Sequence, residues 1–140
     1  AAPHNKGIDI NRCWSAGYTS QTKKDRNYNG TEPFQSYESR GLRDFLLNKK
    51  SQNGQTVLVD LHGWLNETIG DEEIGRFYRS RYGMSKHIYT YGQGYLVNWA
   101  RTNLGSNGRT ARASLVELPE YDQDSSKYIN ATIDMLRSIN

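Results

Sequence analysis

The stretch Thr56-Val57-Leu58-Val59-Asp60-Leu61-His62-Gly63 decides the fold class of this 140-residue chain. Residues 56–61 form a short apolar run rich in β-branched side chains, which is typical of a strand buried on both faces of an α/β sheet. Residues 113–118, Ala-Ser-Leu-Val-Glu-Leu, repeat this pattern, and Pro119 stops the run. The two runs therefore predict two buried strands.

Helical patterns alternate with these strands. Ser36 is a candidate N-cap for a helix over residues 36–50, and Asp71 is one for a helix over residues 72–82. Further helices are predicted over residues 95–103 and 125–139, and the inward face of the last one is expected to carry Ile129, Ile133, Leu136 and Ile139. Residues 1–34 read as a polar loop with a short strand at Ile8–Ile10. Strands that alternate with helices predict an α/β fold, although two strands are few for a self-sufficient domain.

Length and composition exclude several classes of protein. A chain of this size is expected to form a single domain over residues 1–140. Its net charge of +3 is too small for a nucleic-acid binder, and 16 aromatic residues (3 Trp, 10 Tyr, 3 Phe) argue against disorder. One cysteine excludes an internal disulfide framework, and no apolar run is long enough for a transmembrane helix. The first residues do not resemble a signal peptide.

Two polar residues lie at positions where α/β proteins often place catalytic residues. His62 follows the first predicted strand, and active sites gather at the carboxyl ends of such strands. The alternative is a histidine that only caps the strand by hydrogen bonds. Glu117 lies within the second strand, where a carboxylate is costly unless it is paired or faces a cleft. Burial would suit Glu117 as a general base, and a structural ion pair with Arg112 is the alternative.

Two further groups could bind a substrate. Asn11 and Arg12 follow the short strand, and a guanidinium beside an amide is a good cradle for a carboxylate, whereas alone Arg12 would be a surface residue. Tyr89 and Tyr91 lie in a glycine-containing loop, which is typical of a mobile loop that brings a phenol over a cleft. Simple packing of the tyrosine rings is the alternative.

Five segments, in order, resemble the M14 zinc carboxypeptidases, the carboxypeptidase A-like metallopeptidases. They are Gly7-Ile8-Asp9-Ile10-Asn11-Arg12, the stretch from Tyr28-Asn29-Gly30 through Glu38 to Asp44-Phe45, Val59-Asp60-Leu61-His62-Gly63, the loop from Tyr89 to Trp99, and Leu115-Val116-Glu117-Leu118. The resemblance implies a mixed, mostly parallel sheet flanked by helices. It also implies a zinc-dependent enzyme that removes C-terminal residues from peptides.

The resemblance assigns a role to each candidate. His62 would be the third Zn²⁺ ligand and Glu117 the general base, while Asn11 and Arg12 would hold the substrate's terminal carboxylate. Tyr89 or Tyr91 would close over the substrate. The substrate stays open between cell-wall peptides and ordinary peptides, and the expected location is secreted or cell-envelope associated.

The chain departs from the family pattern in its histidines. The family's first two zinc ligands lie on an H-x-x-E motif, and none of His4, His62 and His87 is followed by Glu three positions later. The chain thus looks like the C-terminal half of a catalytic domain, whose N-terminal half would be its partner, as a separate chain or as a missing segment. No nucleic acid or membrane partner is expected. An inactive M14-like scaffold and an aromatic-rich module that binds carbohydrate or peptide are the alternatives.

Overall fold

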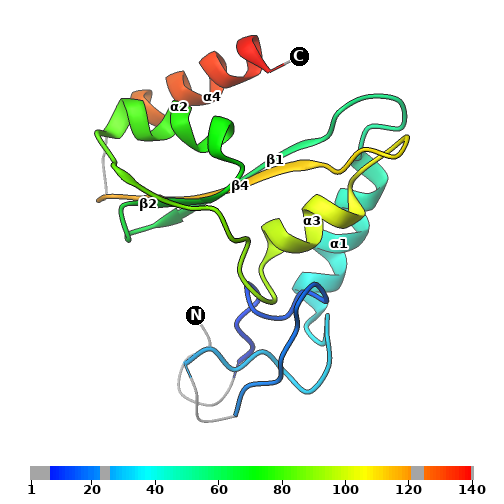
Figure 1. The fold of residues 1–140 in the computed structure, drawn as a ribbon. Helices are drawn as coiled ribbons and strands as arrows, with labels where there is room; N and C mark the ends of the chain where they lie inside the picture. Colours follow the sequence, from blue (N-terminus) through cyan, green and yellow to red (C-terminus); the bar gives the residue numbers. More distant parts are fainter. Residues whose placement is uncertain (1–6, 23–25, 121–124, 140) are drawn as a thin grey trace. The chain divides into compact units, whose positions relative to one another are not determined.

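The structure, a computed structural model, describes residues 7–22, 26–120 and 125–139. Its contacts divide the chain into two compact units. Unit 1 comprises Ala1–Thr56 and Gly92–Ala111, and unit 2 comprises Val57–Tyr91 and Arg112–Asn140. Figure 1 shows the elements of each. The single domain expected over residues 1–140 stays a prediction.

Unit 2 is built on a sheet with the strand order β1-β4-β2-β3. Its strands are β1 (Val57–Gly63), β4 (Arg112–Leu118), β2 (Glu67–Gly70) and β3 (Lys86–Ile88). The β1–β4 and β2–β3 pairs are parallel and the β4–β2 pair is antiparallel. This mixed, mostly parallel sheet confirms the predicted fold class. The sequence pattern missed β2 and β3 because strands of 4 and 3 residues are too short to show a period.

The two predicted strands differ in burial. β4 lies between two neighbours and is buried from Ala113 to Val116, as expected. β1 is only half-buried, and Leu61 is 43% exposed, so the expectation of burial on both faces is wrong for the described residues. The physical reason is its position at the edge, since β1 pairs with β4 alone in the part of the chain that the structure describes.

Two helices cover one face of this sheet (Figure 1). They are α2 (Glu72–Tyr82), which Asp71 caps by accepting a hydrogen bond from the Ile74 amide, and α4 (Ser126–Ser138). Their shared core contains Ile74, Tyr78, Met84, Val116, Ala131 and Met135. The hydroxyl groups of Tyr78 and Thr132 lie 2.8 Å apart and join the two helices.

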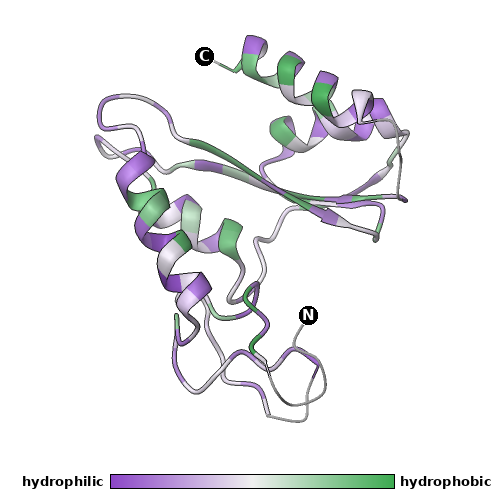
Figure 2. Cartoon of the chain, turned by 180° about the vertical axis from the view of Figure 1, so that it is seen from behind, coloured by the Kyte–Doolittle hydropathy of each residue, from purple (hydrophilic) through white to green (hydrophobic). Residues whose placement is uncertain are grey.

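The predicted inward face of α4 is wrong. Ala131 and Met135 are its buried residues, whereas Ile129, Ile133 and Leu136 are exposed, with Leu136 at 63%. Ile139 alone of the four predicted positions packs against the core. The small Ala131 side chain and the Thr132 hydroxyl suit close packing on α2, so contact with a neighbouring helix rather than local apolar content decided the face. Figure 2 shows how apolar positions are distributed along the helices and strands.

Unit 1 contains two helices and the polar loop. α1 (Tyr37–Lys49) begins after its predicted cap, Ser36, which accepts a hydrogen bond from the Ser39 amide, and α3 is Leu96–Asn103. Trp14, Phe34 and Trp99 form an aromatic cluster, with ring centroids 4.8 Å apart for the two tryptophans. Ile8–Ile10 is not a strand, because the Arg12 amide bonds back to the Asp9 carbonyl and closes a turn.

No helix in the described ranges is both long and apolar enough to cross a membrane.

Candidate functional site

One row of charged and polar residues crosses the whole sheet. His62 of β1 is in register with Glu117 of β4, Glu117 is in register with Glu67 of β2, and Glu67 is in register with Lys86 of β3. Side chains of register partners point to the same face of a sheet. The pairing of the four strands therefore brings together residues that lie between 5 and 55 positions from His62 along the chain.

This row lies on the face of the sheet opposite to α2 and α4. Val57, Val59 and Val116 pack against the helical core, and successive side chains of a strand alternate between faces. His62 and Glu117 are an odd number of positions from those valines in their own strands, so they point the other way. The row of His62, Glu117, Glu67 and Lys86 thus lies on the other face of the sheet from the core that α2 and α4 share.

His62 forms an ion pair with a residue on its own strand. Its Nε2 lies 3.0 Å from Oδ1 of Asp60, two positions earlier and on the same face. The alternative, in which His62 only caps the strand by hydrogen bonds, also stays a prediction, and the structure places His62 within β1, which continues to Gly63. The role of His62 as a metal ligand stays a prediction.

Glu117 is partly buried within β4, as the sequence indicated. Its predicted alternative partner, Arg112, pairs instead with Asp71 at 2.8 Å and with Glu73 at 2.8 Å. The correction follows from strand geometry, because residues five positions apart point to opposite faces. The predicted alternative of a structural ion pair between Glu117 and Arg112 is therefore wrong.

Glu67 is a buried acid directly beside Glu117, and the sequence reasoning did not single it out. It is 5% exposed and forms an ion pair with Lys86 of the neighbouring strand. A buried carboxylate without such a partner would be destabilising, so Lys86 compensates the charge of Glu67. No local pattern could have shown this, because β2 is short and its register with β4 is a tertiary feature.

Asn11 and Arg12 lie together at the start of α3 in unit 1. The Asn11 side-chain oxygen accepts a hydrogen bond from the Leu96 amide at 3.0 Å, in place of a side-chain cap from Tyr95. The Arg12 guanidinium lies 4.2 Å from the centre of the Tyr95 ring and donates to the Asn11 carbonyl. Both side chains are thus held in place by one helix end, while their role in binding substrate stays a prediction.

Gly94 allows that arrangement. Its backbone has φ +72°, and a Cβ atom there would lie 2.4 Å from the Arg12 carbonyl oxygen. The Gly94 carbonyl accepts a hydrogen bond from the Trp14 amide at 3.1 Å. A side chain at this position would push the loop that carries Arg12 away from the start of α3.

The two candidate tyrosines differ in their environment. Tyr89 is 72% exposed, and its ring packs edge-on against His87 with the centroids 4.4 Å apart. Tyr91 is partly buried, and its ring lies so close to Gly70 that a Cβ there would come within 2.8 Å of it. The loop predicted from Tyr89 to Tyr95 is confirmed. The choice of mobile tyrosine remains a prediction.

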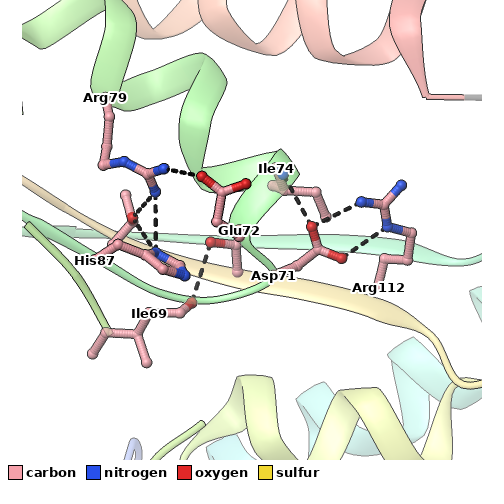
Figure 3. A network of polar contacts seen from close by, with 9 residues as sticks. Ile69, Asp71, Glu72, Ile74, Arg79, His87 and Arg112 are labelled. Atoms are coloured by element: carbon pink, nitrogen blue, oxygen red, sulfur yellow. Dashed lines mark hydrogen bonds and ion pairs between the residues drawn. The ribbon is translucent and has the colours of Figure 1, made fainter. Parts of the chain in front are cut away.

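His87 belongs to a separate polar network on the helix-covered face (Figure 3). Its Nδ1 lies 3.0 Å from the Arg79 guanidinium and 2.8 Å from the Thr68 hydroxyl, and Arg79 also pairs with Glu72. Because arginine can only donate, Nδ1 must accept, which assigns the proton of the neutral ring to Nε2. Burial, followed by the charge of Arg79, lowers the pKa of His87. His87 is therefore on the opposite side of the sheet from His62.

This network predicts a loss of stability in mild acid. The pKa of His87 is lower in the folded protein, so the unfolded chain takes up the proton first as the pH falls. We expect the free energy of unfolding to be constant above the ordinary histidine pKa, about 6.5, and to fall below it until the folded pKa is reached. Urea unfolding at closely spaced pH values measures this, with His87→Gln as the comparison. An identical pH dependence in the variant would contradict the assignment.

The described residues contain no group of three or more His, Cys, Asp or Glu side chains that could hold a metal ion. His62 with its partner Asp60 has the chemistry of a ligating histidine, since such histidines often donate their second N–H to a carboxylate. The signal that could have found Asp60 was its two-residue spacing from His62 on a predicted strand.

The chain resembles known proteins in sequence. Residues 2–69 match the family described as zinc carboxypeptidase, Peptidase_M14. Over 125 residues the chain is 33% identical to bacteriocin BCN5 of Clostridium perfringens. This alignment covers 88% of this chain and 13% of that protein.

Solved structures share the fold. Carboxypeptidase A from Helicoverpa armigera superposes with a TM-score of 0.65 at 16% identity, over 84% of this chain and 34% of that chain. The murein-tripeptide amidase MpaA from Escherichia coli O157 superposes with a TM-score of 0.66 at 18% identity, over 96% of this chain and 59% of that chain.

The mixed sheet and these superpositions define an α/β protein with the carboxypeptidase fold. Residues 2–69 match the zinc carboxypeptidase family, M14, and the chain as a whole shares the fold of the two solved structures. The chain spans less than two thirds of each of these relatives. The matched residues include Asn11, Arg12 and His62, whereas Glu117 lies beyond them.

Proposed function

We propose that this chain is the C-terminal part of a metallocarboxypeptidase catalytic domain, which removes residues from peptides with a free C-terminal carboxylate. The observation that carries the proposal is the register of His62 and Glu117 on adjacent parallel strands. It puts an imidazole and a carboxylate side by side on one face, close to the carboxyl ends of both strands, where α/β proteins build their sites.

His62 would hold a zinc ion in this enzyme. The donor chemistry fits, because a neutral imidazole that is oriented by the Asp60 carboxylate is a common zinc ligand. When bound, zinc would polarise the scissile carbonyl and lower the pKa of water. A catalytic zinc normally has three protein ligands, and in this proposal the other two belong to the N-terminal half of the catalytic domain.

The remaining residues would bind substrate and move a proton. Glu117 would take a proton from the attacking water and pass it to the leaving amine. Asn11 and Arg12 would hold the terminal carboxylate, because a guanidinium fork matches its two oxygens. Tyr89 or Tyr91 would cover the bound peptide.

The partner of this chain would be the N-terminal half of the catalytic domain, in the same protein or as a separate chain. β1 supports this, because a strand paired in parallel on one side, with a half-exposed apolar residue such as Leu61, is suited to a further strand. Cell-wall peptides are one candidate substrate, supported by the fold shared with a murein-tripeptide amidase. A secreted or cell-envelope location would suit such a substrate.

The test uses the complete protein that carries this chain. Purified protein is supplied with zinc and incubated with an N-blocked peptide that ends in a free carboxylate, with the matching C-terminal amide, and with a cell-wall peptide. Amino-acid release is measured by mass spectrometry, and metal content is measured by elemental analysis. We expect release from free carboxylates only. His62→Ala should lose both zinc and activity, whereas the matched variant His87→Ala should keep its zinc.

Two results would overturn the proposal. Folded, zinc-supplied wild-type protein that releases no residue from any of these peptides would favour the inactive scaffold. Full zinc content in His62→Ala would remove His62 from the metal site.

A further inference from the structure

Asp60 occupies an unusual position for a carboxylate. It lies in the middle of β1, and its side chain is 16% exposed. Its register partner on β4 is Leu115, which is in register with Ile69 of β2, and Ile69 is in register with Ile88 of β3. Asp60 thus stands at the end of an otherwise apolar row, one row below that of His62 and Glu117.

A half-buried carboxylate in such a row is costly unless it accepts a hydrogen bond or forms an ion pair. In the part of the chain that the structure describes, the ion-pair partner of Asp60 is the His62 ring, with Oδ1 and Nε2 3.0 Å apart. A leucine or valine at position 60 would pack in this apolar row without the cost of burying a carboxylate. The contact with His62 is therefore what accounts for an acid at position 60.

We propose that Asp60 is a positioning residue for His62. Its carboxylate accepts the Nε2 proton of the neutral ring, which fixes both the tautomer and the plane of the imidazole. Nδ1 is then the ring nitrogen that carries the lone pair and is directed to a metal. This inference rests on the proposed function, since it assumes that His62 is a ligand.

The β1 strand fixes the position of Asp60 relative to His62. Residues 60 and 62 share a face because side chains alternate along a strand, and both backbones are held by pairing with β4. Neither side chain depends on a loop for its position. A ligand that is oriented by a rigid neighbour loses less freedom when it binds a metal, so the carboxylate is expected to strengthen binding.

The experiment measures the zinc affinity of the complete protein by competition with a chromogenic chelator. Asp60→Asn, which keeps the shape but loses the charge, is expected to bind zinc about 10- to 100-fold more weakly. Asp60→Glu should recover part of the affinity. Asp134→Asn is the matched control, because it removes a carboxylate of α4 from an exposed ion pair with Arg81 of α2, and it should bind zinc as the wild type does.

A second readout is independent of the metal. The ¹⁵N resonances of the His62 ring in metal-free protein report which nitrogen carries the proton. We expect the Nε2–H tautomer in the wild type and a larger Nδ1–H population in Asp60→Asn. This measurement on the wild type also decides the question if Asp60→Asn does not fold.

Either of two results would overturn the inference: a wild-type ring protonated on Nδ1, or a folded Asp60→Asn variant with unchanged zinc affinity. Failure of the proposed function would look different. In that case His62→Ala itself would leave zinc binding unchanged, whatever the effect of Asp60→Asn.

Discussion

Replacing Glu117 by glutamine is expected to lower kcat of the complete enzyme by about 100- to 10,000-fold while KM changes little. Glutamine keeps the shape of glutamate but cannot accept a proton from water. Because Glu117 is in register with His62 on the adjacent strand, its carboxylate is placed beside the predicted metal ligand. The measurement is kcat and KM on a peptide with a free C-terminus, with the zinc content of each variant determined in parallel.

The matched control for this prediction is Glu73→Gln. Glu73 is an acid at the start of α2 that pairs with Arg112 on the helix-covered side of the sheet. Its loss should leave kcat unchanged. A zinc-loaded Glu117→Gln enzyme with near-normal kcat would show that Glu117 is not the general base.

Replacing Arg12 by alanine is expected to raise KM by about 10- to 150-fold with a smaller effect on kcat. A hydrogen bond to a charged group contributes about 1.5–3 kcal/mol, which corresponds to this range of affinity. The loss should fall on binding because Arg12 would hold the non-reacting end of the substrate. Steady-state kinetics with increasing peptide concentration measures the effect.

Two comparisons separate this role from a structural one. Arg12 also stacks on Tyr95, so urea unfolding shows whether the variant is simply less stable. Arg43→Ala removes another arginine that stacks on an aromatic ring of unit 1, and it should leave KM unchanged. If Arg12→Ala kept a wild-type KM for a peptide acid, the terminal carboxylate would be bound elsewhere.

The helix boundaries followed from short-range chemistry. Ser36 and Asp71 cap the helices that they were expected to cap, because a side-chain oxygen needs only the amides of the next turn as partners. The strands at residues 57–63 and 112–118 were also recognisable, since runs of β-branched apolar residues favour extended backbone. His62 and Glu117 stood out as polar residues within or directly after such runs.

The burial of the helix and strand faces did not follow from the sequence. The apolar stripe of Ile129, Ile133 and Leu136 was expected to face inward, yet α4 buries Ala131 and Met135 against α2. Periodicity identifies an apolar face but not the neighbour that covers it. The same holds for β1, whose apolar run is half-buried because its position in the sheet, rather than its composition, sets its exposure.

By itself, then, the amino-acid sequence determined the local elements of this protein, the residue types available for chemistry and its likeness to the zinc carboxypeptidases. Only the tertiary structure decided which of those residues meet. The register of β1, β4, β2 and β3 joins His62, Glu117, Glu67 and Lys86 in one row, and it leaves His87 on the other face. Such pairings depend on hydrogen bonds between strands far apart in the chain, and a shift of one residue would reverse every face. No local pattern carries that information.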